Sequence, residues 1–194
     1  MSDIVSDPID IEEKDDAGRV RHRYRIVDEK LDGESVMFDA DGWVAQRANF
    51  KAGVLDGDLV QYEAADARLA VLHYAGGKLE GRAVYFDRGR PRVTIEYRDG
   101  VQDGETTLFG DNGKPTAKQE YKAGKLDGLS SWYRPDGTLF RTAEYVHGQL
   151  DGEMVEYDER GRVKERSIWR ADEMQERVEY KGGKAVREPA GAKR

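Results

Sequence analysis

The chain has 194 residues, 38% of them hydrophobic and 37% charged, and its formal net charge is −7. This apolar content excludes a thick two-layer core along the whole chain, and the many Tyr, Phe, Trp, Val and Leu residues exclude general disorder. The lack of cysteine excludes disulfides, thiolate zinc sites and cysteine nucleophiles.

The first element is an acidic arm, which we place at residues 1–17. Residues 1–16 contain seven acids and one base, and the rest of the chain is almost neutral. Blocks of like charge are most often solvated tails and less often docking arms. The arm lacks the positive start and apolar middle of a secretory signal, so we expect a cytoplasmic protein. As a docking arm it would contact a basic partner through Asp10, Glu12, Glu13, Asp15 and Asp16.

The repeat domain, residues 18–183, follows the arm and has a period of 24 residues. Residues 1–30 are expected to cap the array at one end, and residues 18–25 within them fit the second half of a copy. A fixed short period is typical of an array in which each unit packs mainly on its neighbours. Six clear copies and one eroded copy begin at Leu31, Leu55, Leu79, Gln102, Leu126, Leu150 and Met174.

Each copy is predicted to form a β-hairpin. In the copy at Leu126, the β-rich runs 129–134 and 138–146 are separated by Pro-Asp-Gly, and segment 122–128 joins this copy to the one before it. Asp-Gly is favoured in hairpin turns, since Gly readily adopts a positive φ. The predicted fold class is therefore all-β: an elongated antiparallel meander of about 12–14 strands in a single twisted, curled sheet.

Side-chain alternation along each strand predicts which columns share a face. Two aromatic columns, one in each strand of the hairpin, are expected to form one apolar face, and the opposite face is expected to be wet. The first column contains Phe38, Tyr62, Phe86, Phe109, Tyr133 and Tyr157, and the second contains Phe50, Tyr74, Tyr97, Tyr121, Tyr145 and Trp169.

Positions that break the pattern of the repeat are the candidates for partner binding. One column of the expected wet face is mostly large and apolar, and two unrepeated aromatics lie beside hairpin turns. Clustered exposed aromatics mark interaction sites more often than single ones do. The alternative is that these side chains cover a neighbour, the capping arm or a dimer contact. The candidates are Met37, Tyr85, Leu108 and Trp132 in the column, and Trp43 and Phe140 beside the turns.

No catalytic, cofactor or metal site is expected. The chain has no nucleophile-elbow or P-loop sequence, and residues 38–42 lack the later ligands of a calcium loop. The Asp of Asp-Gly recurs in almost every copy, which is typical of a structural residue. The near-neutral repeat domain also lacks the basic stripe that nucleic-acid binding needs. The last element, residues 184–194, is a basic tail.

The spacing Gly-x-Leu-Asp-Gly-x-x-x-x-Tyr, followed by a turn Gly and a second Tyr, resembles MORN repeats, in particular the MORN-variant repeats of the YwqK-type antitoxin family. The resemblance implies a non-enzymatic protein-binding module, an antitoxin or immunity protein that neutralises a cognate bacterial toxin or secreted effector. The acidic balance favours a partner with a basic surface. The alternative is a MORN-type scaffold that contacts proteins or membrane lipid, here through the basic tail. We expect the protein to be monomeric.

Overall fold

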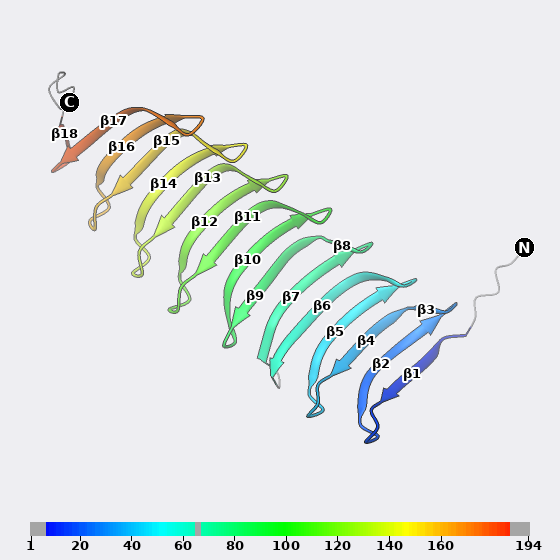
Figure 1. Cartoon of the computed structure of the whole chain (residues 1–194). Helices are drawn as coiled ribbons and strands as arrows, with labels where there is room; N and C mark the ends of the chain where they lie inside the picture. The colour runs from blue at the N-terminus through cyan, green and yellow to red at the C-terminus, as the bar shows by residue number, and fades with distance from the viewer. Residues whose placement is uncertain (1–6, 65–66, 187–194) are drawn as a thin grey trace, which may run out of the picture. The chain divides into compact units, whose positions relative to one another are not determined.

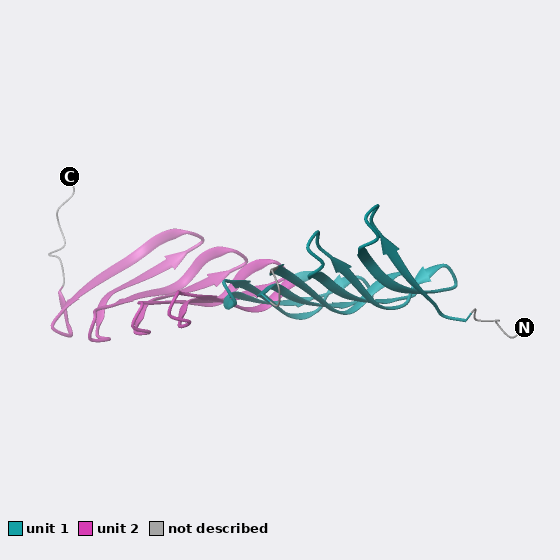
Figure 2. Ribbon diagram, turned by 90° about the horizontal axis from the view of Figure 1, so that it is seen from below, with its two compact units in different colours: residues 1–101 teal, residues 102–194 magenta. Residues whose placement is uncertain are grey.

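The computed structural model describes residues 7–64 and 67–186, and all regular structure in these residues is β-strand (Figure 1). The chain forms two compact units, Met1–Val101 and Gln102–Arg194, which are coloured separately in Figure 2. Within each unit, strands that follow one another in the chain pair antiparallel, except for the two parts of a divided strand, which pair with the same neighbour. The all-β meander of hairpins predicted from the repeat is therefore confirmed.

Unit 1 contains the N-terminal segment and the first three copies. The N-terminal segment forms an edge hairpin in which Ile9 lies opposite Ile26 and Glu12 opposite Arg23. The first strands of the copies at Leu31 and Leu79 are each divided in two, by an irregularity at Asp32 and at Glu80 respectively. The strands are β1 (Ile9–Lys14), β2 (Val20–Val27), β3 (Lys30–Leu31), β4 (Gly33–Phe38), β5 (Val44–Lys51), β6 (Val54–Ala64), β7 (Ala67–Ala75), β8 (Lys78–Leu79), β9 (Gly81–Asp87) and β10 (Arg90–Arg98).

Unit 2 begins inside β11 and contains the remaining copies. The described residues contain eighteen strands, more than the predicted 12–14. The additional strands come from the divided strands of unit 1, the N-terminal hairpin and the eroded copy. The strands are β11 (Val101–Phe109), β12 (Pro115–Lys122), β13 (Lys125–Tyr133), β14 (Leu139–Val146), β15 (Gln149–Tyr157), β16 (Val163–Arg170), β17 (Glu173–Lys181) and β18 (Lys184–Val186).

Two kinds of turn alternate along each unit. The turns between copies have two central residues with positive φ, such as Ala52 (φ 49°) and Gly53 (φ 83°). This is the geometry of a type I′ turn, whose twist matches that of the flanking strands. The turns within copies are longer and use one glycine, such as Gly42 (φ 88°). The shortened third copy replaces the longer turn with a two-residue turn at Arg88 and Gly89, both with positive φ.

The Asp-Gly pair near the start of most copies forms a bulge inside the strand and not a turn. Phe50 lies opposite Leu55 and Ala48 opposite Leu59, so three residues on β6 face a single residue on β5. The bulge glycine has a positive φ, 129° at Gly152. A Cβ atom there would lie only 2.8 Å from a side-chain carbon of the facing strand, so the position requires glycine.

The aspartate of the Asp-Gly pair holds the type I′ turn at the far end of its own copy. The carboxylate of Asp32 accepts a hydrogen bond from the backbone N–H of Ala52 at 3.0 Å, and Asp127 accepts one from His147 at 3.1 Å. Aspartates 56, 103 and 151 make the equivalent bond. This contact explains why the aspartate recurs: it closes the turn about twenty residues later.

The expectation that both aromatic columns share one face is wrong. In unit 1, Ser35 lies opposite Ala48 and Ala48 opposite Leu59. Phe50 of the second aromatic column packs against this row. We call this side of the sheet the core face, and it carries the most deeply buried side chains, with Ala48 fully buried. Met37 has the same strand parity as Ser35 and belongs to the core face as well.

The first aromatic column lies on the other side, which we call the ion-pair face. Val36 lies opposite Arg47, and the guanidinium carbon of Arg23 is 5.4 Å from the ring centre of Phe38. Arg47 also binds Glu34 at 2.9 Å. Parity within a strand did not predict this arrangement, because the register shifts beside the turn at Phe38 and the sequence does not show how the two strands of a hairpin align.

Unit 2 has the same two faces. On its core face the central row runs through Thr106, Gln119, Ser130 and Ala143, each of which lies opposite the next on the neighbouring strand. The second aromatic column lies two residues further along the same strands, as Tyr121 lies after Gln119 and Tyr145 after Ala143. On its ion-pair face Lys118 binds Glu105 at 3.2 Å and Arg166 binds Glu153 at 2.5 Å.

Candidate interaction surfaces

An apolar strip lies on the core face of unit 2. Leu108 is opposite Ala117, and Ala117 is opposite Trp132, so the three side chains lie on neighbouring strands β11, β12 and β13. Arg141 is opposite Trp132 and binds Glu156 at 2.6 Å, which ends the strip with an ion pair. Leu108 is exposed and Trp132 is half-buried. The sequence placed Leu108 and Trp132 in one column, and the structure brings them together through the small side chain of Ala117.

In unit 1 the candidate residues of the same column, Met37 and Tyr85, differ in burial. Met37 is exposed, whereas Tyr85 is half-buried and packs against the apolar cluster of the core face. Burial raises the pKa of Tyr85 above 10.0, and the neighbouring Tyr97 and Tyr74 act in the same direction. Tyr85 is therefore part of the packing in unit 1, which is one of the alternatives that its sequence pattern left open.

Trp43 projects from the turn between β4 and β5. The backbone N–H of Asp39 donates to the carbonyl oxygen of Trp43 at 2.9 Å, and Gly42 donates to Asp39 at 3.2 Å. The Asp39 carboxylate accepts the backbone N–H groups of Asp41 and Trp43, both at 2.9 Å. These bonds close the turn, while the Trp43 side chain is 55% exposed.

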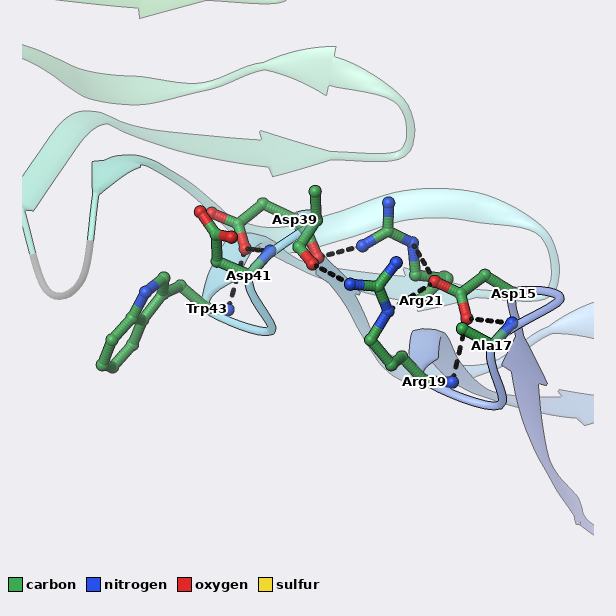
Figure 3. Close-up of polar contacts among 8 residues, drawn as sticks. Asp15, Ala17, Arg19, Arg21, Asp39, Asp41 and Trp43 are labelled. Atoms are coloured by element: carbon green, nitrogen blue, oxygen red, sulfur yellow. Dashed lines mark hydrogen bonds and ion pairs between the residues drawn. The ribbon is translucent and has the colours of Figure 1, made fainter.

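The neighbouring turn between β1 and β2 braces the Trp43 turn (Figure 3). Arg19 Nη1 donates to the carbonyl oxygen of Ala40 at 3.1 Å, and Arg21 donates to that of Asp39. Arg19 Nε also binds the Asp15 carboxylate at 2.9 Å. The indole of Trp43 extends away from Asp15, Arg19 and Arg21 in this view. A fixed turn therefore presents an exposed aromatic side chain.

Phe140 lies at the bulge where the pairing of β13 and β14 shifts register. The guanidinium carbons of Arg134 and Arg141 lie 5.2 and 5.1 Å from its ring centre, which are cation–π distances. Phe140 lines an open recess of about 560 Å³. The other lining residues are Arg134, Tyr157, Asp158, Glu159, Arg160, Arg162 and Lys164.

The basic character of this recess was missed in the sequence. Four bases and two acids line it, although the chain is acidic overall. Arg162 binds Asp158 at 2.8 Å, and Arg134 donates to the carbonyl oxygens of Leu139 and Tyr157. A usable signal was present: Arg134 occupies the turn position that aspartate occupies in other copies.

Four acids of the N-terminal arm are bound within the molecule. Residues 9–14 of the arm form β1, and the acids of β1 face the bases of β2. Residues 9–25 hold five acids and five bases, so this segment has no net charge. The bonds are Asp10–Arg25 at 2.8 Å, Glu12–Arg23 at 2.8 Å, Glu13–Tyr24 at 2.8 Å and Asp15–Arg19 at 2.9 Å.

These bonds change the ionisation of the arm. The pKa of Asp10 lies below its usual value because the Arg25 guanidinium donates to its carboxylate, and Arg23 has the same effect on Glu12. The pKa of Asp15 is lowered chiefly by the backbone N–H of Arg19. The use of Asp10, Glu12, Glu13, Asp15 and Asp16 as partner contacts stays a prediction. A partner would compete with internal arginines for Asp10, Glu12 and Asp15, and with the Tyr24 hydroxyl for Glu13.

Some predicted features lie outside the described residues. These are residues 1–6 of the arm, residues 65 and 66 of the repeat domain, and the end of the basic tail with Arg187, Lys193 and Arg194. Within the described residues, no group of His, Asp and Glu side chains is arranged to hold a metal ion. The same part of the chain contains no helix with the length and apolar character needed to cross a membrane.

The sequence of the repeat agrees with a known family in both units. The model of the MORN repeat variant family matches residues 31–52 in unit 1 and residues 102–123 in unit 2. Each match covers one copy from its leading residue through the second aromatic column. A comparison with curated proteins gave no match. These two copies are therefore similar in sequence to MORN repeat variants.

Proposed function

We propose that this protein is a non-enzymatic binding module whose partner is another protein. The observation that carries the proposal is the apolar strip Leu108–Ala117–Trp132 on the core face of unit 2. Trp, once buried at an interface, contributes far more binding energy than most side chains. The ion pair of Arg141 and Glu156 borders the strip and supplies the polar rim that interfaces usually have.

The use of the repeated carboxylates supports a non-enzymatic role. A catalytic acid or base needs a free carboxyl group within reach of a substrate. Asp32 and Asp127 instead accept backbone N–H groups of the type I′ turns, and Asp39 and Asp158 accept those of the longer turns. The repeated aspartates thus have structural roles that need no substrate.

Within this role, we propose that the partner is a bacterial toxin or secreted effector, which the protein binds and neutralises as an antitoxin or immunity protein. The resemblance of the repeat to antitoxin arrays supports this part of the proposal. The test is co-expression with the product of the adjacent gene. We expect the adjacent product to arrest growth alone, growth to recover with this protein, and the two proteins to copurify. Absence of both binding and rescue would overturn the toxin assignment.

The strip itself is tested with Trp132→Ala in the same copurification. Loss of a central interface tryptophan typically weakens binding by about 2 kcal/mol, or roughly 30-fold. Leu129→Ala is the matched control, because Leu129 is exposed on the same strand but alternates to the ion-pair face. Equal affinities of the two variants for a bound partner would place the interface elsewhere.

One observation favours a second candidate, a scaffold that contacts an anionic membrane. The recess of unit 2 presents the charges of Arg134, Arg160, Arg162 and Lys164 around Phe140. Each base in such a cluster contributes about 1 kcal/mol to the free energy of binding to an anionic lipid surface. Sedimentation with phosphatidylserine vesicles, compared with neutral vesicles, tests this candidate. Charge-independent or absent sedimentation would exclude it.

A further inference from the structure

We propose that the Trp43 turn of unit 1 is a docking site for an arginine side chain of the protein partner. The proposal rests on the protein-binding function above and names the chemistry of one contact. It concerns the turn between β4 and β5, whose closing bonds and bracing arginines are described above, and not the strip of unit 2.

The first support is the electrostatic setting of the indole. A guanidinium group stacks on tryptophan better than on any other aromatic ring, and a nearby carboxylate strengthens the contact. The braced pair of turns contains four carboxylates, those of Asp15, Asp16, Asp39 and Asp41, against the two guanidiniums of Arg19 and Arg21. The region therefore attracts a cation, although residues 9–25 as a whole are neutral.

The second support is that the two carboxylates of the Trp43 turn, those of Asp39 and Asp41, differ in use. The Asp39 carboxylate is held by the backbone N–H groups of Asp41 and Trp43, and its carbonyl oxygen by Arg21. The Asp41 carboxylate, two residues before Trp43, makes no hydrogen bond or ion pair within the described residues. An incoming guanidinium thus meets one structural carboxylate that fixes the turn and one available carboxylate in the same turn as Trp43.

The third support is that the aromatic residue is not needed by the turn. The same position is occupied by Arg19, Lys114, Thr138 and Arg162 in the other turns of this type. In each of the turns of Asp15 and Asp158, a carboxylate accepts the backbone N–H of that residue at 2.9 Å, as Asp39 does for Trp43. The turn fixes the backbone of Trp43, so less conformational entropy is lost when a partner binds.

The experiment uses the full-length protein and a peptide of alternating glycine and arginine as the probe. The chain has three tryptophans, so three indole N–H signals are expected in a nitrogen–proton correlation spectrum. The Trp43 signal is the one absent from Trp43→Thr, a change that the turn accepts because Thr138 occupies the same position. A peptide with citrulline in place of arginine is the control, since citrulline keeps the shape and lacks the charge.

We expect the arginine peptide to shift the Trp43 signal and the citrulline peptide to bind several-fold more weakly. An exposed cation–π contact of about 0.5–1 kcal/mol corresponds to a change of roughly 2- to 5-fold. Asp41→Asn should weaken binding by a similar factor without lowering the melting temperature, and 0.5 M salt should weaken it further by screening.

Equal shifts with both peptides, or an unmoved Trp43 signal, would overturn the arginine site. Unchanged affinity in Asp41→Asn would also overturn it, because the available carboxylate is part of the proposal. These outcomes are separate from the test of the proposed function, which depends on Trp132 and on a captured protein partner. A partner that requires Trp132 but leaves the Trp43 signal unmoved would retain the function and reject this site.

Discussion

Units 1 and 2 are built from the same repeat, but the middle rows of their core faces differ in chemistry. In unit 1 the buried row is largely apolar, and in unit 2 it is largely made of hydroxyl and amide side chains. The repeat therefore accepts both apolar and polar side chains in this row. The rows are Ser35, Ala48, Leu59, Leu72 and Ala83 in unit 1, and Thr106, Gln119, Ser130, Ala143, Met154 and Ser167 in unit 2.

This difference changes what stabilises each row. Apolar side chains stabilise the folded state because their surface is removed from water, as for Leu59 and Leu72 in the buried cluster of unit 1. Buried hydroxyls contribute only if they are hydrogen-bonded. Ser167 accepts the indole N–H of Trp169 at 2.8 Å, and Thr106 accepts the side chain of Gln102 at 2.7 Å. The Ser130 hydroxyl is fully buried and has no hydrogen-bond partner within the described residues.

The largest expected effect comes from the apolar row of unit 1. Leu72→Ala should lower the free energy of unfolding by about 2–4 kcal/mol, because it removes buried methyl groups and leaves a cavity. Leu69→Ala on the same strand is the control, since Leu69 is 44% exposed against 8% for Leu72. Its effect should stay within about 0.5 kcal/mol in urea unfolding. Similar losses for both variants would contradict a packed core in unit 1.

The second-largest expected loss of stability comes from substitution of the bulge glycines, and it differs between the two units. Gly152→Ala in unit 2 should lower stability by about 2 kcal/mol, because a positive φ and a close side-chain carbon both oppose a Cβ. Gly81→Ala in unit 1 should lower it by only about 1 kcal/mol, since its φ is positive but no atom lies within 4 Å of the added Cβ. Thermal unfolding of the two variants checks which one is less stable. A larger loss in Gly81→Ala would show that the Glu144 side chain facing Gly152 moves away easily.

A smaller effect distinguishes the hydroxyls within unit 2. Ser130→Ala should leave stability unchanged or raise it by up to about 1 kcal/mol, because it removes a buried oxygen with no partner. Ser167→Ala should lower stability by about 1 kcal/mol, since the indole N–H of Trp169 loses its acceptor. Both changes remove one oxygen atom at a buried site. A clear loss in Ser130→Ala would indicate that its hydroxyl has a hydrogen-bond partner in solution.

The smallest effect is the pH dependence of unit 1. The pKa of Tyr85 is raised by burial above the ordinary value of 10.0, so the folded state holds the phenol proton more strongly than the unfolded state. This contribution is fully present below pH 10 and is lost as the pH rises through the folded pKa. In Tyr85→Phe, the fall in melting temperature between pH 8 and about pH 11 should be smaller. An equal fall in both proteins would show that Tyr85 ionises as freely as it does when unfolded.

Several features of the site followed from pattern alone. The column containing Leu108 and Trp132 was recognised because four large apolar side chains interrupt a polar alternation, and the structure places these two on either side of Ala117 in β12. Trp43 was recognised because it is unrepeated, and it is exposed as expected. The acidic arm was recognised as a charge block, but its pairing with the arginines of β2 depends on which strands become neighbours, and a linear charge count does not contain that information.

The sequence by itself determined the repeat, the hairpins and the all-β class, because these depend on short-range rules: glycine at positive φ, alternation along a strand, and a constant period. Tertiary structure alone decided which columns share a face, since a register shift at Phe38 reverses the relation between the two strands of a hairpin. It also decided the role of the recurring aspartate. The bond from Asp32 to the backbone of Ala52 joins residues that are twenty apart and meet only after the strands between them have paired.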